Sequence, residues 1–248
     1  MIQIGVAAAV AAMVNLAGVQ AAVIADWQFT SNATLLDDSS GNGNTLANSG
    51  VTWSASNGGS AVFNGSAILN TVATLNLAPF TEIRVEWGMV TSQTAGAIVW
   101  ESSVDANSVT GGMFGAINDQ LAAGQFDSTA RRNSGVVINK YALMPGDVGT
   151  VLHDYAVEIS GSDLGTTQMK FFVDNVEVSS TWFQGPTASA QTFLNDTFFI
   201  GARSGGVAGF NGSLDYLTVS SVPEPSTWAM AALGLTVVVT MRRAASRA

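Results

Sequence analysis

The sequence has 248 residues, of which 47% are hydrophobic and 11% are charged, and its formal net charge at pH 7 is −9. A negative surface repels phosphate backbones, which argues against nucleic acid as a partner. Cations and neutral sugars remain compatible with such a surface as ligands. Cysteine is absent, so disulfides, thiolate zinc sites and cysteine nucleophiles are excluded.

An alanine-rich apolar run fills residues 4–19 at the start of the chain. Val19 and Ala21 then place short side chains at the two positions that a signal peptidase reads before its cleavage point. Met1-Ile2-Gln3 lacks the basic residues that usually open such a segment. The pattern predicts a signal peptide over residues 1–21, with a buried N-terminal helix as the alternative.

Apolar and polar residues alternate with a period of two through much of the region 22–220. Such alternation, punctuated by glycine-rich turns, is typical of many short antiparallel strands. The clearest predictions are a strand at 153–159, a hairpin at 169–178 that turns at Asp174-Asn175, and two strands at 197–202 and 213–220. We therefore expect a single all-β domain over residues 22–220, built as a sandwich or barrel.

Seven short motifs follow one another in this region. They are Asp26-Trp27-Gln28-Phe29, the loop from Leu36 to Asn44, the strand from Ala61 to Ser66, the strand from Phe80 to Trp87, Phe171-Phe172-Val173-Asp174-Asn175, Phe199-Ile200-Gly201-Ala202-Arg203, and the strand from Phe210 to Leu217. In this order they resemble the laminin-G-like, concanavalin A-like family. The resemblance implies an antiparallel jelly-roll β-sandwich, although residues 88–150 match none of its motifs.

The loop from Asp37 to Asn44 is rich in Asp, Ser, Asn and Gly, which supply turns and the oxygen ligands that calcium prefers. Read as an EF-hand from Asp38, the loop has Ser49 at the twelfth position, where a glutamate is needed. The family resemblance implies one calcium ion held by carboxylates and loop carbonyls, and the residues that could supply this site are Asp26, Asp37, Asp38, Asn42 and Asp215. The alternative is a plain cluster of turns.

The strand Glu82-Ile83-Arg84-Val85-Glu86 resembles the catalytic strand of family 16 glycoside hydrolases, but Arg84 stands where an aspartate is needed. We expect Arg84 to pair with both glutamates and to lower their pKa values, which does not suit a general acid. His153 is the only histidine, and we assign it a structural role. The sequence therefore predicts no catalytic residue, whereas Trp53 and Trp182, as loop aromatics, could form a platform for a sugar.

The C-terminus combines Pro223-Glu224-Pro225, an apolar run at 228–241 and a basic end at 242–248 that begins with Arg242 and Arg243. A helix of about 14 residues spans about 21 Å, which is short for a bilayer core of about 30 Å. The order of the three parts resembles the PEP-CTERM sorting tail of Gram-negative bacteria. The resemblance implies a short transmembrane helix outside the fold and processing by an exosortase around Pro223, Glu224 and Pro225, within a tail at 221–248.

These observations predict a protein exported from a Gram-negative bacterium with signal peptidase and exosortase as partners. It would pass through the inner membrane transiently by its C-terminal helix and finish at the cell surface or in the extracellular matrix. We expect a non-catalytic, lectin-like domain that binds an extracellular polysaccharide, since a binding site needs only a few polar groups and an aromatic surface. The alternatives are a secreted glycan hydrolase of the same fold and a structural exopolymer component without a ligand.

Overall fold

The computed structural model describes residues 21–93, 96–104, 112–117, 124–131, 137–160, 168–184 and 193–222. Residues 23–222 form one compact unit. The predicted signal peptide, apart from its last residue, and the sorting tail from residue 223 onward lie outside the described residues. Within the described part of the chain, no helix is long and apolar enough to cross a membrane.

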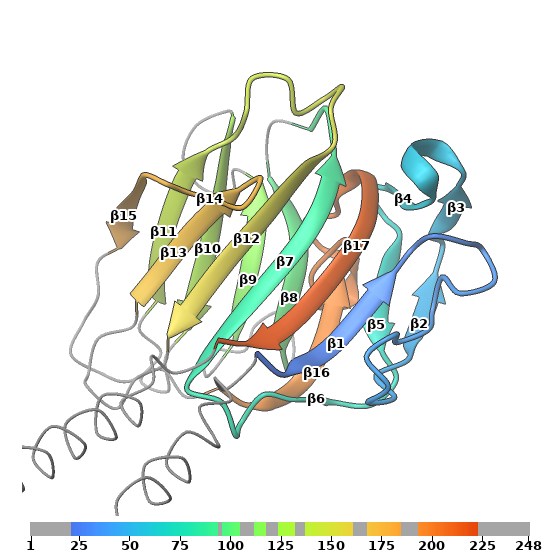
Figure 1. Cartoon of the computed structure of the whole chain (residues 1–248), viewed down its shortest axis with the longest axis horizontal. Helices are drawn as coiled ribbons and strands as arrows, with labels where there is room; N and C mark the ends of the chain where they lie inside the picture. Colours follow the sequence, from blue (N-terminus) through green and yellow to red (C-terminus); the bar gives the residue numbers. More distant parts are fainter. Residues whose placement is uncertain are drawn as a thin grey trace, which may run out of the picture. The chain divides into compact units, whose positions relative to one another are not determined.

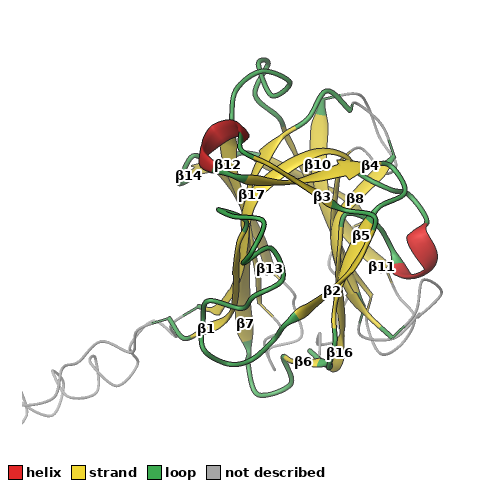
Figure 2. Cartoon of the chain, turned by 90° about the vertical axis from the view of Figure 1, so that its right-hand side faces the viewer, coloured by secondary structure: helices red, strands yellow, loops and turns green. Residues whose placement is uncertain are grey.

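Two antiparallel sheets face each other in this unit (Figures 1 and 2). Sheet A has the order β14-β13-β12-β7-β17-β4-β3, with β1 also paired to β17. Its strands are β1 (Val23–Gln28), β3 (Thr52–Ser54), β4 (Ser60–Asn64), β7 (Glu82–Val90), β12 (His153–Ser160), β13 (Gln168–Val173), β14 (Val176–Val178) and β17 (Asn211–Ser221).

Sheet B has the order β15-β11-β10-β9-β8-β16-β5-β2, with β6 also paired to β16. Its strands are β2 (Leu46–Ser49), β5 (Ile68–Thr71), β6 (Leu75–Asn76), β8 (Ala97–Ser103), β9 (Met113–Ile117), β10 (Gln125–Arg131), β11 (Val137–Leu143), β15 (Ser180–Gln184) and β16 (Asn195–Ile200). Two short 3₁₀ turns, η2 (Ser56–Gly58) and η3 (Ser204–Gly206), lie in the connections. The expected all-β, antiparallel sandwich is confirmed.

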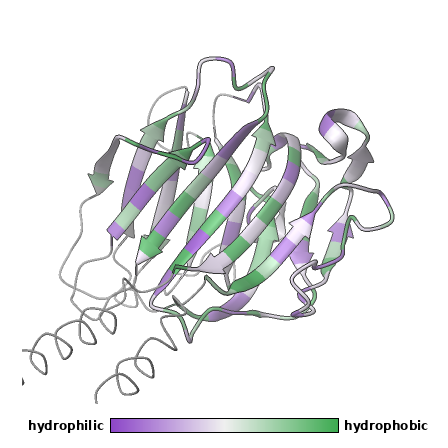
Figure 3. Ribbon diagram, in the orientation of Figure 1, coloured by the Kyte–Doolittle hydropathy of each residue, from purple (hydrophilic) through white to green (hydrophobic). Residues whose placement is uncertain are grey.

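Alternation along the strands builds the core between the sheets. In β7, Ile83, Val85 and Trp87 are buried while the residues between them lie on the outer face, and Figure 3 shows the same banding along the strands of sheet A. The ring centroids of Trp87 and Tyr155 lie 5.9 Å apart in a stacked pair. A second stack joins Trp100 and Phe198 across 5.8 Å, so large aromatic side chains from both sheets fill the interior.

The outer face of sheet B is also partly covered. Ile98, Phe114 and Ala116 form a second buried cluster, separate from the main core, and Ala208 from the connection between β16 and β17 packs against it. Arg203 of the same connection bonds to Glu101. Strands β8 and β9 are buried along their whole length, and they lie in the region 88–150 where the sequence offered no motif.

The compact unit begins and ends on neighbouring strands. Val23 of β1 pairs with Ser220 of β17, and the Val222 amide donates to the Glu82 carbonyl at the start of β7. The other end of β17 pairs with the end of β7 and with β4, as Ser213 lies opposite both Val90 and Val62. We call this second end of sheet A the distal end.

Candidate functional site

The carboxylate of Asp38 organises the predicted calcium loop through hydrogen bonds. Its Oδ1 accepts from the backbone amides of Asp26 and Ser40, each at 3.0 Å, and its Oδ2 accepts from the backbone amide of Asn44 at 2.8 Å and from the Asn44 Nδ2 at 3.1 Å. Burial opposes ionisation of Asp38, but these bonds outweigh it and hold its pKa below the usual value. Both carboxylate oxygens of Asp38, one of the candidate calcium ligands, therefore already accept hydrogen bonds from the loop.

Side-chain amides bind the carbonyls that surround this carboxylate. Asn42 Nδ2 donates to the carbonyls of Val23 and Ile24 at 2.9 and 3.0 Å, and Asn44 Nδ2 donates to the Ile24 carbonyl at 2.8 Å. Asp26 Oδ1 accepts from Gln28 Nε2 and Thr218 Oγ1, an arrangement that ties β1 to β17. The loop thus fastens itself to the first strand of the sandwich.

The structure brings Asp26, Asp38 and Asn42 together and places Asp215 elsewhere. Asp215 lies at an irregularity in β17 beyond the opposite end of β1, where its carbonyl accepts from the Phe29 amide. Burial, and then the charge of Asp154, raise the pKa of Asp215 to about 6. Among the described residues, no group of three or more acidic or histidine side chains is arranged to hold a metal ion. Calcium binding stays a prediction, and the hydrogen bonds favour the alternative of a turn cluster.

The strand that resembles a hydrolase motif carries an ion-pair network on the outer face of sheet A. Arg84 Nε lies 2.9 Å from Glu86 Oε2, and its Nη1 lies 3.1 Å from Glu158 Oε1 on β12. The guanidinium also stands 4.6 Å from the centre of the Phe172 ring.

The expected pairing of Arg84 with both flanking glutamates is wrong for Glu82. Register explains the difference, because Arg84 lies directly opposite Glu158, and Glu82 lies opposite Ser160. Burial, followed by the charge of Glu158, raises the pKa of Glu82, against a smaller effect of Lys170. A glycosidase needs two carboxyl groups with separate roles, and on this strand Arg84 already pairs with one of the two glutamates, Glu86.

His153 joins two segments of the surface. Its Nδ1 lies 2.9 Å from Asp174 Oδ2 in the turn between β13 and β14, and its Nε2 lies 3.0 Å from Asp147 Oδ1 in the loop that precedes β12. Both ring nitrogens can donate only when the imidazole is protonated. Burial works against that charge, but the two bonds and the two negative charges outweigh it and raise the pKa of His153.

The two tryptophans predicted as loop platforms lie on strands instead. Trp53 belongs to β3, and its Nε1 donates to the Phe29 carbonyl at 2.9 Å. Trp182 belongs to β15, and the Lys140 ammonium stands 5.0 Å from the centre of its ring. Both side chains are partly buried against the core, because alternation turns one face of each edge strand inward. The prediction of loop positions is wrong for both residues.

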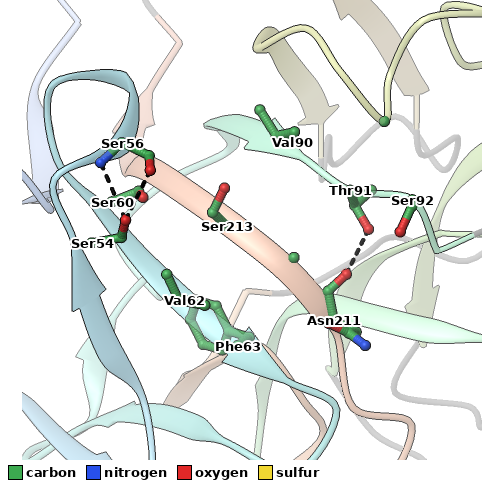
Figure 4. A pocket seen from close by; sticks show the side chains of 12 residues that line it. Ser54, Ser56, Ser60, Val62, Phe63, Val90, Thr91, Ser92, Asn211 and Ser213 are labelled. Atoms are coloured by element: carbon green, nitrogen blue, oxygen red, sulfur yellow. Dashed lines mark hydrogen bonds between the residues drawn. The ribbon is translucent and has the colours of Figure 1, made fainter.

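A pocket of about 310 Å³ opens at the distal end of sheet A (Figure 4). Sequence reasoning missed it, because its walls come from β3, β4, the end of β7, the start of β17 and the loop before β12. Its lining residues are Ser54, Ser56, Ser60, Val62, Phe63, Val90, Thr91, Ser92, Gly149, Asn211, Gly212 and Ser213. None of these residues is charged, and six of them carry a hydroxyl group.

Hydrogen bonds hold the walls of this pocket. Thr91 Oγ1 donates to the Asn211 carbonyl at 2.7 Å, and the Thr91 amide donates to the Val148 carbonyl at 3.2 Å. On the other side, Ser54 Oγ donates to Ser56 Oγ at 3.0 Å. The pocket is therefore a fixed part of the fold, with neutral donors and acceptors around an apolar base.

Comparison with solved structures finds similar sandwiches. Domain 4 of AbnA, an extracellular arabinanase from Geobacillus stearothermophilus solved with arabinotriose, has 17% identity and a TM-score of 0.51, with 82% of this chain and 93% of that chain covered. The receptor-binding domain of botulinum neurotoxin mosaic serotype C/D has 11% identity and a TM-score of 0.60, with 86% of this chain and 51% of that chain covered. At these identities the likeness establishes the fold alone.

Sequence comparison identifies the tail. No curated protein matches the chain in sequence. Residues 221–244 match the PEP-CTERM protein-sorting motif, which agrees with the order of Pro223-Glu224-Pro225, apolar run and arginines in the sequence. The motif implies export that depends on an exosortase, with a membrane-anchored stage. The chain therefore joins a jelly-roll-like β-sandwich to a PEP-CTERM sorting motif.

Proposed function

We propose that this chain is a non-catalytic carbohydrate-binding protein of the cell surface or extracellular matrix of a Gram-negative bacterium. The observation that carries the proposal is the sorting motif at 221–244, which begins where the last strand, β17, ends. A sorting motif placed directly after a sandwich makes that sandwich the exported cargo.

Two of the similar structures support the choice of ligand class. The arabinanase domain was solved in complex with arabinotriose, and the cell entry of botulinum neurotoxin type C depends on interaction with two ganglioside molecules. Arabinotriose is a saccharide and a ganglioside is a sugar-bearing lipid, and the matched part makes up 48% of the neurotoxin chain. In this chain, the uncharged pocket at the distal end of sheet A offers hydroxyl groups that can bind a sugar.

The arrangement of acidic groups favours binding over hydrolysis. Arg84 neutralises Glu86 and Glu158 on the outer face of sheet A. A retaining glycosidase needs two carboxyl groups at about 5–5.5 Å, one of them an acid of raised pKa. Both carboxylates are engaged by the same guanidinium, an arrangement that does not leave them free to act as a nucleophile and an acid on a sugar.

A glycan array combined with a hydrolysis screen tests this proposal. The full-length chain, purified in mild detergent, is expected to be retained on at least one neutral polysaccharide without releasing reducing ends. Release of reducing ends that is lost in Glu82→Gln or Glu86→Gln would instead establish a hydrolase. A lack of retention on every polysaccharide would leave a structural role in the exopolymer and contradict the binding proposal.

A further inference from the structure

The geometry points to the distal pocket as the saccharide-binding site, with selectivity for a neutral sugar unit over a uronic acid. This inference rests on the proposed function and adds to it a place on the molecule and a class of ligand. Three features support the inference: the hydroxyl-rich lining of the pocket, its apolar base and the acidic charge of the surrounding domain.

The lining matches the chemistry of an uncharged sugar. Ser213 projects from β17 at the centre of Figure 4, with Ser60 on one side and Thr91 on the other. Hydroxyl groups both donate and accept hydrogen bonds, so they can complement sugar hydroxyls of either orientation. Val62 adds partly exposed apolar surface against which the carbon face of a sugar ring can lie, whereas Phe63 faces the core.

One buried group in the wall lacks a partner. Ser60 is fully buried, and its Oγ has no hydrogen-bond partner within the described part of the chain. Buried hydroxyl groups are normally satisfied, and an exception in a pocket wall is accounted for by a bound water or a ligand hydroxyl. This observation is independent of the composition of the lining, and it also indicates a polar occupant.

The volume of the pocket limits the size of the ligand that can enter. A volume of about 310 Å³ is at the lower end of the range of about 300–1,000 Å³ that small-molecule sites occupy. The site therefore suits a terminal sugar or a short segment of a chain.

Charge provides the selectivity. No lining residue carries a positive charge to pair with a carboxylate. The region 22–220 contains 6 basic and 17 acidic residues, so its field repels anionic sugars. A uronate would lose its hydration in the pocket without gaining an ion pair, and this penalty separates acidic from neutral polysaccharides.

Calorimetric titration of the full-length chain in mild detergent tests the inference. Arabinotriose, xylotriose and cellotriose serve as neutral ligands, and trigalacturonate serves as the acidic one. Ser213→Ala is expected to weaken binding of the neutral ligand roughly threefold to tenfold, the effect of one lost hydrogen bond. Ser213→Trp, which fills the pocket, is expected to abolish binding. Ser220→Ala and Ser220→Trp, at the other end of β17, are the matched controls.

The outcomes separate this inference from the function on which it rests. Neutral ligands that bind with equal affinity to wild type and both Ser213 variants would place the site elsewhere and overturn the inference, while leaving the binding function intact. Tighter binding of trigalacturonate would overturn the selectivity. Absence of binding to all four ligands would count against both. Melting curves identify a misfolded Ser213→Trp, in which case the Ser213→Ala result decides.

Discussion

The contacts of His153 and Gly115 predict that substitutions at either residue destabilise the fold. His153 is held by one aspartate from a turn and one from a loop, 2.9 and 3.0 Å from its two ring nitrogens. Gly115 faces the core on β9, where a Cβ would lie 2.3 Å from the Trp100 Nε1. The first position depends on charge and the second on space, so they respond to different perturbations.

The stability contributed by His153 should depend on pH. Its pKa is higher in the folded protein than in the unfolded chain, so its contribution is complete below the unfolded value of about 6.5. That contribution is lost as the pH rises through the folded pKa. Urea unfolding of wild type and His153→Gln from pH 5 to pH 9 should show a difference in free energy that shrinks toward alkaline pH.

The contact between His153 and Asp174 should also weaken at low pH, where Asp174 becomes protonated. The hydrogen bond from His153 lowers the pKa of Asp174 against a smaller opposing effect of burial, so its contribution is lost as the pH falls through that lowered pKa. In an Asp174→Asn background, the His153→Gln substitution should therefore show a smaller pH dependence, with the Asp147 contact remaining. A difference that stays constant from pH 5 to pH 9 would contradict the charged contact.

Gly115→Ala should destabilise the domain through Trp100. The added methyl group forces the indole out of its stack with Phe198, and overpacking of this kind costs about 1–3 kcal/mol. Gly146→Ala is the control, since a Cβ there meets no atom within 4 Å. Thermal melts should show a lower melting temperature for Gly115→Ala and little change for Gly146→Ala, and equal melts would contradict the packing.

At the scale of elements, the sequence predicted strands where alternation is regular and missed them where it is not. The hairpin at 169–178 and the strand at 153–159 appear as β13, β14 and β12, because one face of sheet A meets water. Strand β8 has all seven residues buried, so its two faces could not be distinguished by pattern. The connection near Ala208 covers the outer face of β8. This is a tertiary contact, so the local sequence pattern of β8 does not reveal it.

The two candidate sites also differ in whether the sequence could reveal them. The Asp37–Asn44 loop was found because its residues are contiguous and its turn chemistry is local. The distal pocket was not, because Ser54, Ser60, Thr91, Gly149 and Ser213 are small residues brought together from distant segments. Sequence reasoning can identify a loop that folds on itself, whereas a neutral pocket between strands leaves no signature along the chain.

Loss of the Asp38 carboxylate should loosen the first strand. Asp38→Asn exchanges one acceptor oxygen for a donor, so it breaks bonds to Asp26 and Ser40 or to Asn44 and should cost about 1–3 kcal/mol. In the absence of calcium, Asp37→Asn is the adjacent control, because Asp37 is itself a candidate calcium ligand. The same melts in millimolar calcium and in chelator test the metal prediction, which requires a calcium-dependent rise that vanishes in Asp38→Asn. If calcium does not raise the melting temperature of the wild type, the loop is better explained as a hydrogen-bonded turn than as a calcium site.

At the scale of the whole molecule, the tail and the sandwich should act separately. Glu224→Ala alters the sorting motif at 221–244 and changes no residue of β17, which ends at Ser221. We expect unprocessed, membrane-bound protein to accumulate in the native host while the melting temperature of the domain stays unchanged. Glu177→Ala, at an exposed position of β14, should be processed normally. Normal processing of Glu224→Ala would contradict a role of the motif in export.

The course of β17 has a mechanical consequence. The strand runs from Ser213 in the distal pocket to Ser221 at the start of the tail, a span of roughly 25 Å at about 3.3 Å per residue, and it pairs along this length with β1 and β7. A polymer held in the pocket of a tethered protein would pull along the axis of β17. Its ladder hydrogen bonds lie across that axis, so they bear the load in shear and must break together. Tension between polymer and cell would therefore be resisted by shear of the ladders that β17 forms with β1 and β7.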